Sequence, residues 1–311
     1  MAQPSHVHGP RVRDPRSLHS ARVRPANHVR LHRLLAPLAR HALLAIVAVI
    51  FMGPIYWMVI SGFKSMGEIF AQPIVWWPHT LQWNNIGDVL NYPGFPFLRF
   101  LWNSIVYAGA VTIGTVLSCV AGGYGFARLR FPGRNLLFGV TIATLMIPWI
   151  ITFIPTYVMF RYLGLLGGYA PLIAPAFVGA VPGVSGLFIF MLRQFFMGLP
   201  WELSEAAKVD GAGEFLIFWR IMLPLVRPAL IVVAVFTFVW TWQGFFGPLV
   251  YLSDPNQYPL TLGLFAFRAQ RTTDWPLLMA AATLSMLPLV ALFFMTQRYF
   301  VQGITMTGLK G

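Results

Sequence analysis

The chain has 311 residues, of which 57% are hydrophobic and 10% charged, with a mean hydropathy of +0.68. This composition excludes a soluble globular protein and indicates an integral membrane protein. A single cysteine, Cys119, excludes an internal disulfide framework. Six of the seven histidines precede residue 42 without a Glu or Cys partner, which argues against a metal site.

The first 41 residues are polar and contain eight arginines. Such a run invites two interpretations, binding to nucleic acid or attraction to anionic membrane lipid. Its Pro, His and Arg content favours a disordered cytoplasmic tail over residues 1–41, which orients the chain and approaches lipid, with no nucleic acid as partner.

Six long stretches without a charged residue follow the tail. A membrane-spanning helix needs about 20 mostly apolar residues, and each stretch is long enough. They predict an all-α integral membrane protein with six transmembrane helices within a domain over residues 42–300. The expected spans are about 42–63, 103–127, 135–160, 169–192, 228–250 and 275–297. A further uncharged stretch, residues 69–87, contains prolines, asparagines and three tryptophans and predicts an interfacial loop.

The arginines and lysines predict the orientation of these spans. With six spans, both termini lie on one side, and that side carries 17 of the 22 Lys and Arg residues, against 5 on the other. Because positive residues are retained on the cytoplasmic side, the N-terminus and the tail over residues 301–311 are expected in the cytoplasm.

The six uncharged stretches hold no carboxylate, histidine or lysine that could couple transport to an ion gradient. The three lysines stand in no phosphate-binding loop, and there is no HExxH or GxSxG motif. The chain is therefore expected not to be an enzyme and to bind no cofactor itself. If it moves a solute actively, another subunit supplies the energy. A stand-alone secondary carrier or channel, and a membrane scaffold, remain as alternatives.

Two features inside the spans concern packing and the solute path. Small residues recur every fourth position in the second span, at Ala110, Gly114, Ser118 and Gly122, and predict close helix packing. Two kinds of residue indicate a candidate translocation path. Helix-breaking residues free backbone groups, which must face protein or a cavity at membrane depth. A cluster of aromatic side chains with one amide could stack on a sugar and form hydrogen bonds with it. The residues of this path are Pro175, Pro182, Trp240, Thr241, Trp242 and Gln243.

The connection between the fourth and fifth spans, residues 198–224, carries the most specific pattern. Pro200 and two early acids predict a short helix that Gly211 stops. A second helix is expected from about Glu214, closed by Pro224. Two short helices at a glycine turn are suited to docking in a partner groove.

The spacing within this connection resembles the cytoplasmic EAA loop of the permease subunits of binding-protein-dependent ABC importers. The matching residues are Glu205, Ala206, Ala207, Asp210, Gly211, Ile221, Leu223 and Pro224. Within that family the chain is similar to the carbohydrate branch. Its C-terminal end, residues 297–311, resembles the maltose-type partner with a short tail, although Thr307-Gly308 replaces the usual Gly-Ala.

The resemblance implies a type I ABC importer permease in the inner membrane of a prokaryotic cell, importing a sugar or related solute. Its partners would be a second homologous permease, two copies of an ATPase that uses ATP and Mg, and an extracytoplasmic solute-binding protein. It also implies polar contacts of Glu205 and Asp210 with the ATPase, and close approach at Ala206, Ala207 and Gly211. Contacts of the C-terminal tail would involve Gly303, Thr305 and Lys310. The fifth span has Gln243-Gly244 where related permeases often have Asn followed by an acid, so its solute path departs from that pattern.

Overall fold

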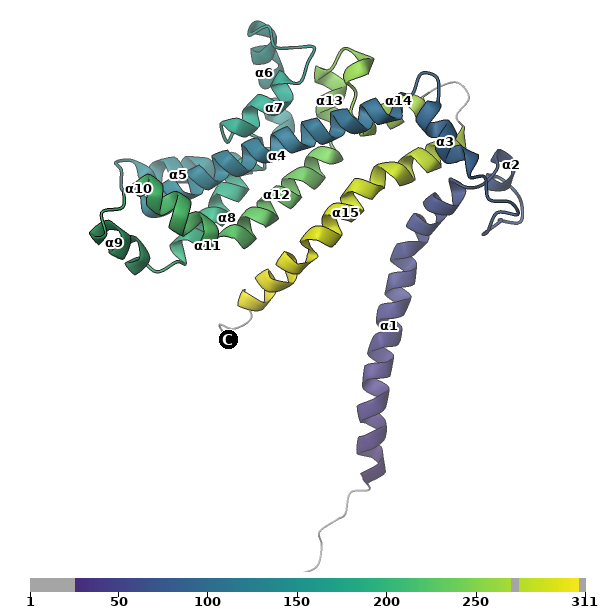
Figure 1. The fold of residues 1–311 in the computed structure, drawn as a ribbon, viewed down its shortest axis with the longest axis horizontal. Helices are drawn as coiled ribbons and strands as arrows, with labels where there is room; N and C mark the ends of the chain where they lie inside the picture. The colour runs from purple at the N-terminus through teal and green to yellow at the C-terminus, as the bar shows by residue number, and fades with distance from the viewer. Residues whose placement is uncertain (1–25, 270–273, 308–311) are drawn as a thin grey trace, which may run out of the picture. The chain divides into compact units, whose positions relative to one another are not determined.

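The computed structural model of the chain describes residues 26–269 and 274–307 (Figure 1). Within these ranges the backbone forms α-helices, short 3-10 turns and a π-helical segment, and no β-strand. The predicted all-α fold class is therefore confirmed.

Two compact units divide the chain, residues 1–55 and residues 56–311. The described part of the first unit is one helix, α1 (Ala26–Ser61), whose last residues belong to the second unit. Its segment Ala39–Ser61 has a mean hydropathy of 2.5, and the side chains over residues 41–54 are exposed. The helix begins before the expected start of the first span, so residues 26–41, part of the expected tail, are helical. Leucine, alanine and arginine are frequent there and favour helix. Residues 1–25 lie outside the described residues.

Helix α4 (Phe97–Arg128) is the long central element of the second unit and packs against α7, α8 and α12. A Cβ atom at Gly114 would lie 2.7 Å from the Phe177 ring, and the Ser118 Oγ donates a hydrogen bond of 2.7 Å to the Ala176 carbonyl. Gly122, one turn further, faces Ile189. The predicted packing role of this small-residue stripe is confirmed, because its members let neighbouring helices approach closely.

The expected third span is broken. Helix α5 (Arg134–Ala143) and the 3-10 turn η1 (Thr144–Met146) are followed by α6 (Trp149–Tyr162), at an angle of 104°. Pro148 is the N-cap of α6, and Ile147 before it is extended. Proline disfavours helical geometry in the preceding residue and lacks an N–H, which explains a bend at this point.

The expected fourth span is also divided, into α7 (Ala170–Phe177) and α8 (Ser185–Met197). The connection contains Gly179 and Gly183 with φ values of +67° and +71°. A right-handed helix cannot continue through such residues, and both positions favour glycine. The Ser185 Oγ accepts a hydrogen bond of 3.0 Å from the Val181 N–H in this connection.

The helix of the fifth span is shorter than expected, whereas the sixth span lies within a helix that continues beyond it. Helix α12 (Arg227–Trp242) ends before Gln243, and a separate helix, α13 (Phe246–Tyr251), follows. The turn η3 (Pro255–Gln257) and α14 (Leu260–Arg268) lead to α15 (Trp275–Thr307). Between α1 and α4, the helices α2 (Met66–Ile69) and α3 (Asn84–Asn91) lie at the two ends of the expected interfacial loop over residues 69–87. Because α3 begins at Asn84, the last residues of that loop are helical.

Three helical segments in the described residues are long and apolar enough to cross a membrane: Ala39–Ser61, α4 and Trp275–Arg298. Two bent pairs, from Arg134 to Tyr162 and from Glu214 to Trp242, raise the number to five if each pair is one span. Helices α7 and α8 are individually too short to be counted, so the number six remains a prediction.

Two main clusters of buried side chains lie toward opposite ends of α4. One joins the second half of α4 with α8, the start of α12 and the connection between them, and includes Tyr124, Phe196 and Met222. The other joins the start of α4 with α3, α14 and α15, and includes Phe100 and Trp242. The first cluster therefore underlies the connection over residues 198–224.

We predict that Gly123→Ala weakens the contact between α4 and α8. The added Cβ atom would lie 2.8 Å from the Leu192 Cβ and 3.1 Å from the Arg193 backbone nitrogen. Overpacking of this kind costs about 1–3 kcal/mol, so the midpoint of thermal unfolding in detergent decreases. Gly109→Ala, in the same helix with no atom within 4 Å, is the control and keeps or raises the midpoint. Equal midpoints for the two variants would contradict the packing.

Candidate functional site

The first arm of the 198–224 connection is helix α9 (Glu202–Val209), and its two ends are as predicted. Pro200 precedes it, and Glu202 and Glu205 lie in its first turn, near the positive end of the helix dipole. Gly211, with φ +83°, ends the helix. The Gly211 N–H donates to the Lys208 carbonyl at 3.0 Å and the Ala212 N–H to the Ala207 carbonyl at 2.9 Å. This pair of bonds is a Schellman motif and makes a rigid stop.

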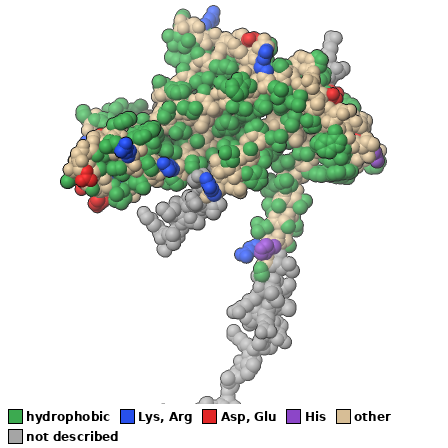
Figure 2. Space-filling view, viewed as in Figure 1, with side chains coloured by type: hydrophobic (Ala, Val, Ile, Leu, Met, Phe, Trp, Pro, Cys, Tyr) green, Lys and Arg blue, Asp and Glu red, His purple; other side chains and the backbone are tan. Residues whose placement is uncertain are grey.

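The motif residues of α9 separate into two faces. Ala207 is buried in the cluster beneath the connection, together with Ile217 and Met222. Glu205 and Ala206, and then Asp210 and Gly211, are exposed. Figure 2 shows acidic side chains gathered at the end of the second unit where α9 and α10 lie in Figure 1. The connection thus presents acidic and small residues outward.

The second arm is one helical run that differs from the prediction at its end. It consists of α10 (Glu214–Leu216), the π-helical segment η2 (Ile217–Met222) and α11 (Leu223–Leu225). Pro224 does not close this run, which continues to Leu225, one residue beyond it. The bend of 77° comes later, at Val226 before α12.

The remaining motif residues on this arm face the protein. Ile221 and Leu223 are partly buried and pack against the cluster beneath the connection, and Pro224 is partly buried. Their contribution to the connection is therefore to hold the second arm in place.

Polar contacts join the two arms to each other and to α4. Across the turn, the Lys208 Nζ lies 2.5 Å from a carboxylate oxygen of Glu214. The Tyr124 hydroxyl donates a hydrogen bond to Glu214, and Arg128 contacts the chain just before α9. Sequence reasoning missed Tyr124 and Arg128 as functional candidates. The available signal was their spacing of four residues, which places both on one face of a helix.

The candidate path residues are not brought together at one cavity. Trp240 is 71% exposed, whereas Trp242 is buried, stacks on Phe238 at 5.4 Å and donates its indole N–H to the Ser285 carbonyl. Thr241 is buried and Gln243 is the exposed C-cap of α12, so the cluster lies at the end of this helix. Pro175 lies inside α7 and Pro182 in the connection to α8. The path assignment stays a prediction.

The C-terminal candidates have little structural description. Gly303 and Thr305 lie in the last turns of α15, where only the backbone is described, and Lys310 lies outside the described residues. Across the described residues, no group of three or more His, Cys, Asp or Glu side chains could hold a metal ion.

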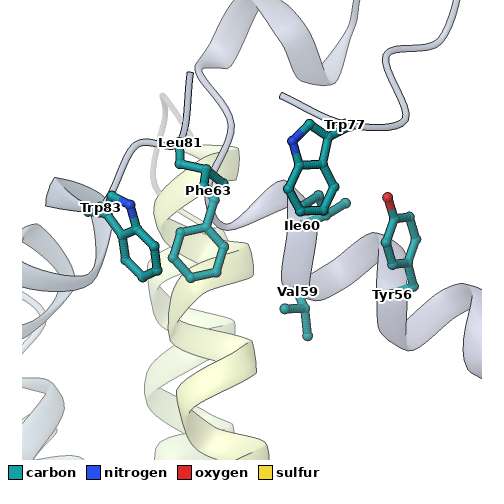
Figure 3. A pocket seen from close by; sticks show the side chains of 7 residues that line it. All are labelled: Tyr56, Val59, Ile60, Phe63, Trp77, Leu81 and Trp83. Carbon is teal, nitrogen blue, oxygen red and sulfur yellow. The ribbon is translucent and has the colours of Figure 1, made fainter. Parts of the chain in front are cut away.

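An apolar pocket of about 450 Å³ lies at the end of α1 that belongs to the second unit (Figure 3). Its lining residues are Tyr56, Val59, Ile60, Phe63, Trp77, Leu81 and Trp83. Beside it, the buried Lys64 donates a hydrogen bond of 2.6 Å to the Val75 carbonyl and lies 3.8 Å from the Trp57 ring centroid. Burial lowers the pKa of Lys64. Lys64 therefore holds the 69–87 connection against α1. None of the residues proposed for the translocation path lines the pocket.

Comparison with known proteins identifies the family. The family described as the inner membrane component of binding-protein-dependent transport systems matches residues 114–306, more than half of the chain. A probable ABC transporter permease of Pyrococcus horikoshii is 36% identical over 74% of this chain and 83% of that protein. The sn-glycerol-3-phosphate transport system permease UgpE of Yersinia enterocolitica is 32% identical over 85% and 94%. The arabinooligosaccharides transport system permease AraQ of Halalkalibacterium halodurans is 31% identical over 86% and 94%.

Solved structures agree on the fold. A chain in the crystal structure of a bacterial ABC transporter involved in the import of the acidic polysaccharide alginate superimposes with a TM-score of 0.76. The match covers 87% of this chain and 98% of that chain at 23% identity.

The chain therefore belongs to the family of inner-membrane permease subunits of binding-protein-dependent ABC transport systems. It is a multi-pass membrane protein with the ABC importer permease fold, as the resemblance implied. Membership in this family confirms the predicted permease-subunit function and argues against a stand-alone secondary carrier or channel.

We predict that Gly211→Ala loosens the stop of α9. No atom lies within 4 Å of the added Cβ, so the cost is the left-handed backbone alone, about 1–2 kcal/mol. Amide hydrogen exchange over α9 becomes faster. Gly211→Asn is the control, because asparagine adopts this backbone more readily, and it exchanges more like the wild type. Wild-type exchange in the alanine variant would show that the turn carries no such constraint.

Proposed function

We propose that this permease subunit couples to a separate ATPase through the connection over residues 198–224, called here the coupling loop. The observation that carries the proposal is the division of the motif residues between two faces. Ala207, Ile221 and Leu223 pack inward, while Glu205 and Asp210 are exposed beside Ala206 and Gly211. A rigid pair of short helices with an outward acidic face suits a groove that offers positive or hydrogen-bonding groups.

In this assignment the ATPase is a pair of identical subunits that bind ATP and Mg, and the permease binds no cofactor. Closure of the two ATPase subunits on ATP would displace the coupling loops of two permeases and rock the bundles between inward and outward access. The C-terminal residues Gly303, Thr305 and Lys310 are proposed to contact the ATPases as well.

The second permease is a homologue that completes the translocation path, and an extracytoplasmic binding protein delivers the solute. The excess of Lys and Arg in the connections assigned to one side supports cytoplasmic N- and C-termini in the inner membrane of a prokaryotic cell. The basic N-terminal segment is proposed to approach anionic lipid, with no role for nucleic acid.

The solute is proposed to be a sugar or a related compound. This class is supported by relatives whose names refer to sn-glycerol-3-phosphate and to arabinooligosaccharides. Within this chain, Pro175 and Pro182 at the helix breaks, and Trp240 to Gln243 at the end of α12, remain the proposed contributors to the path. Trp240 is the accessible aromatic face of that group.

We predict that Glu205→Ala in the reconstituted transporter lowers both retention of the ATPase and solute uptake by about tenfold or more. The substitution removes the carboxylate and so leaves a polar group of the ATPase unpaired at the interface. Glu202→Ala is the matched control: Glu202 is also an exposed carboxylate in the first turn of α9 but stands outside the motif. If both functions of Glu205→Ala survive unchanged, the docking assignment is wrong.

We also expect uptake by proteoliposomes that contain both permeases, the ATPase and the binding protein to require ATP. Collapse of the ion gradients with an ionophore should leave it unchanged, because the uncharged stretches in the sequence hold no coupling carboxylate, histidine or lysine. Gradient-driven uptake by this chain alone, without ATP, would contradict the proposal.

A further inference from the structure

Arg128, the last residue of α4, binds the chain where α8 ends and the coupling loop begins. Its side chain is only 6% exposed. The Nε and Nη2 atoms donate hydrogen bonds of 3.0 and 2.6 Å to the Phe196 carbonyl, and Nη2 donates a further bond of 2.6 Å to the Leu199 carbonyl. The guanidinium carbon lies 4.5 Å from the ring centroid of Trp201, the N-cap residue of α9.

These contacts use the specific geometry of an arginine. The last carbonyls of a helix have no partner within the helix, and the fork of a guanidinium can satisfy two acceptors while its face stacks on an aromatic ring. Arg128 thereby joins the end of α8 to the residue at which the first arm begins.

Tyr124 lies one helical turn earlier in α4 and reaches the second arm. Its hydroxyl donates a hydrogen bond of 3.0 Å to the Glu214 carboxylate, which also pairs with Lys208 on the first arm. Its ring packs against Phe196 and Phe218, with centroid distances of 5.5 and 4.8 Å. In the part of the chain that the structure describes, the polar side-chain contacts between the coupling loop and the helices come from Tyr124 and Arg128.

We propose that Tyr124 and Arg128 are positioning residues that fasten both arms of the coupling loop to α4, so that a displacement of the loop moves α4 instead of bending the loop. The inference rests on the proposed docking of this loop on an ATPase. Helix α4 can pass the displacement on, because it packs closely against α7 and α8 at Gly114 and Gly123 and also contacts α12. The hydrogen bonds of Tyr124 and Arg128 go to Glu214, Phe196 and Leu199 and not to the exposed motif residues Glu205 and Asp210, so docking and force transfer depend on different side chains.

Tyr124→Phe is the decisive variant, because it removes the hydroxyl and keeps the ring in the cluster. In the complete reconstituted transporter, we expect wild-type retention of the ATPase but about a tenfold lower ratio of solute taken up to ATP hydrolysed, as for loss of a hydrogen bond to a charged group. Hydrogen exchange should become faster in the coupling loop, with the thermal unfolding midpoint lowered by only a few degrees. In a Glu214→Ala background, where the acceptor is already gone, Tyr124→Phe should have no further effect.

Arg128→Met tests the other fastening, with Arg130→Met as control, since Arg130 is an exposed arginine two residues away. We expect uncoupling in the first variant alone, and Arg128→Lys should not restore coupling, because a single ammonium cannot reproduce the fork. Wild-type coupling ratios in Tyr124→Phe and Arg128→Met, or a further loss from Tyr124→Phe in the Glu214→Ala background, would overturn the inference. Failure of the wild-type chain to retain the ATPase would instead overturn the proposed docking.

Discussion

The close approach of α4 to α7 and α8 is the packing constraint on which the second unit depends. Lipid gives apolar helices no hydrophobic reason to associate, so contact has to come from close packing and from hydrogen bonds between helices. Gly114 and Gly123 allow the approach, since a Cβ atom at either position would clash with the neighbouring helix. The same surface of α4 also contacts backbone carbonyl groups near the break between α7 and α8. The Ser118 hydroxyl donates to the Ala176 carbonyl, and the Cys119 thiol lies 3.6 Å from the Ser185 carbonyl. A broken helix is tolerated at membrane depth only with partners of this kind.

The C-terminal end of the same helix explains why the coupling loop can be rigid although its arms are short. Isolated helices of this length are marginal in water and need tertiary contacts. Ala207, Ile217 and Met222 supply an apolar base beneath both arms, and the turn between them is held by the Schellman motif at Gly211. The inward residues therefore stabilise the loop, and the outward residues can contact a partner without being needed for that stability.

Predictions that depended on local chemistry agreed with the structure. Pro200, the early acids and Gly211 marked the ends of α9, because capping and backbone preferences act within one helical turn. The small-residue stripe on α4 marked its close contacts for a similar reason. The second arm continued one residue beyond Pro224 and contained a π-helical segment that the local pattern did not predict. The sequence also placed Trp240 and Trp242 in one aromatic cluster, whereas one is exposed and the other is buried against α15.

The sequence by itself determined that this protein is helical, lies in a membrane and resembles permease subunits, because composition, the lengths of uncharged stretches and residue spacing are properties of neighbouring residues. Only the tertiary structure decided where the spans break and which motif residues face outward. It also decided which side chains hold the coupling loop. The hydrogen bonds of Arg128 to Phe196 and of Tyr124 to Glu214 join residues 68 and 90 positions apart. Contacts at such separations depend on how the helices pack, and no local pattern encodes them.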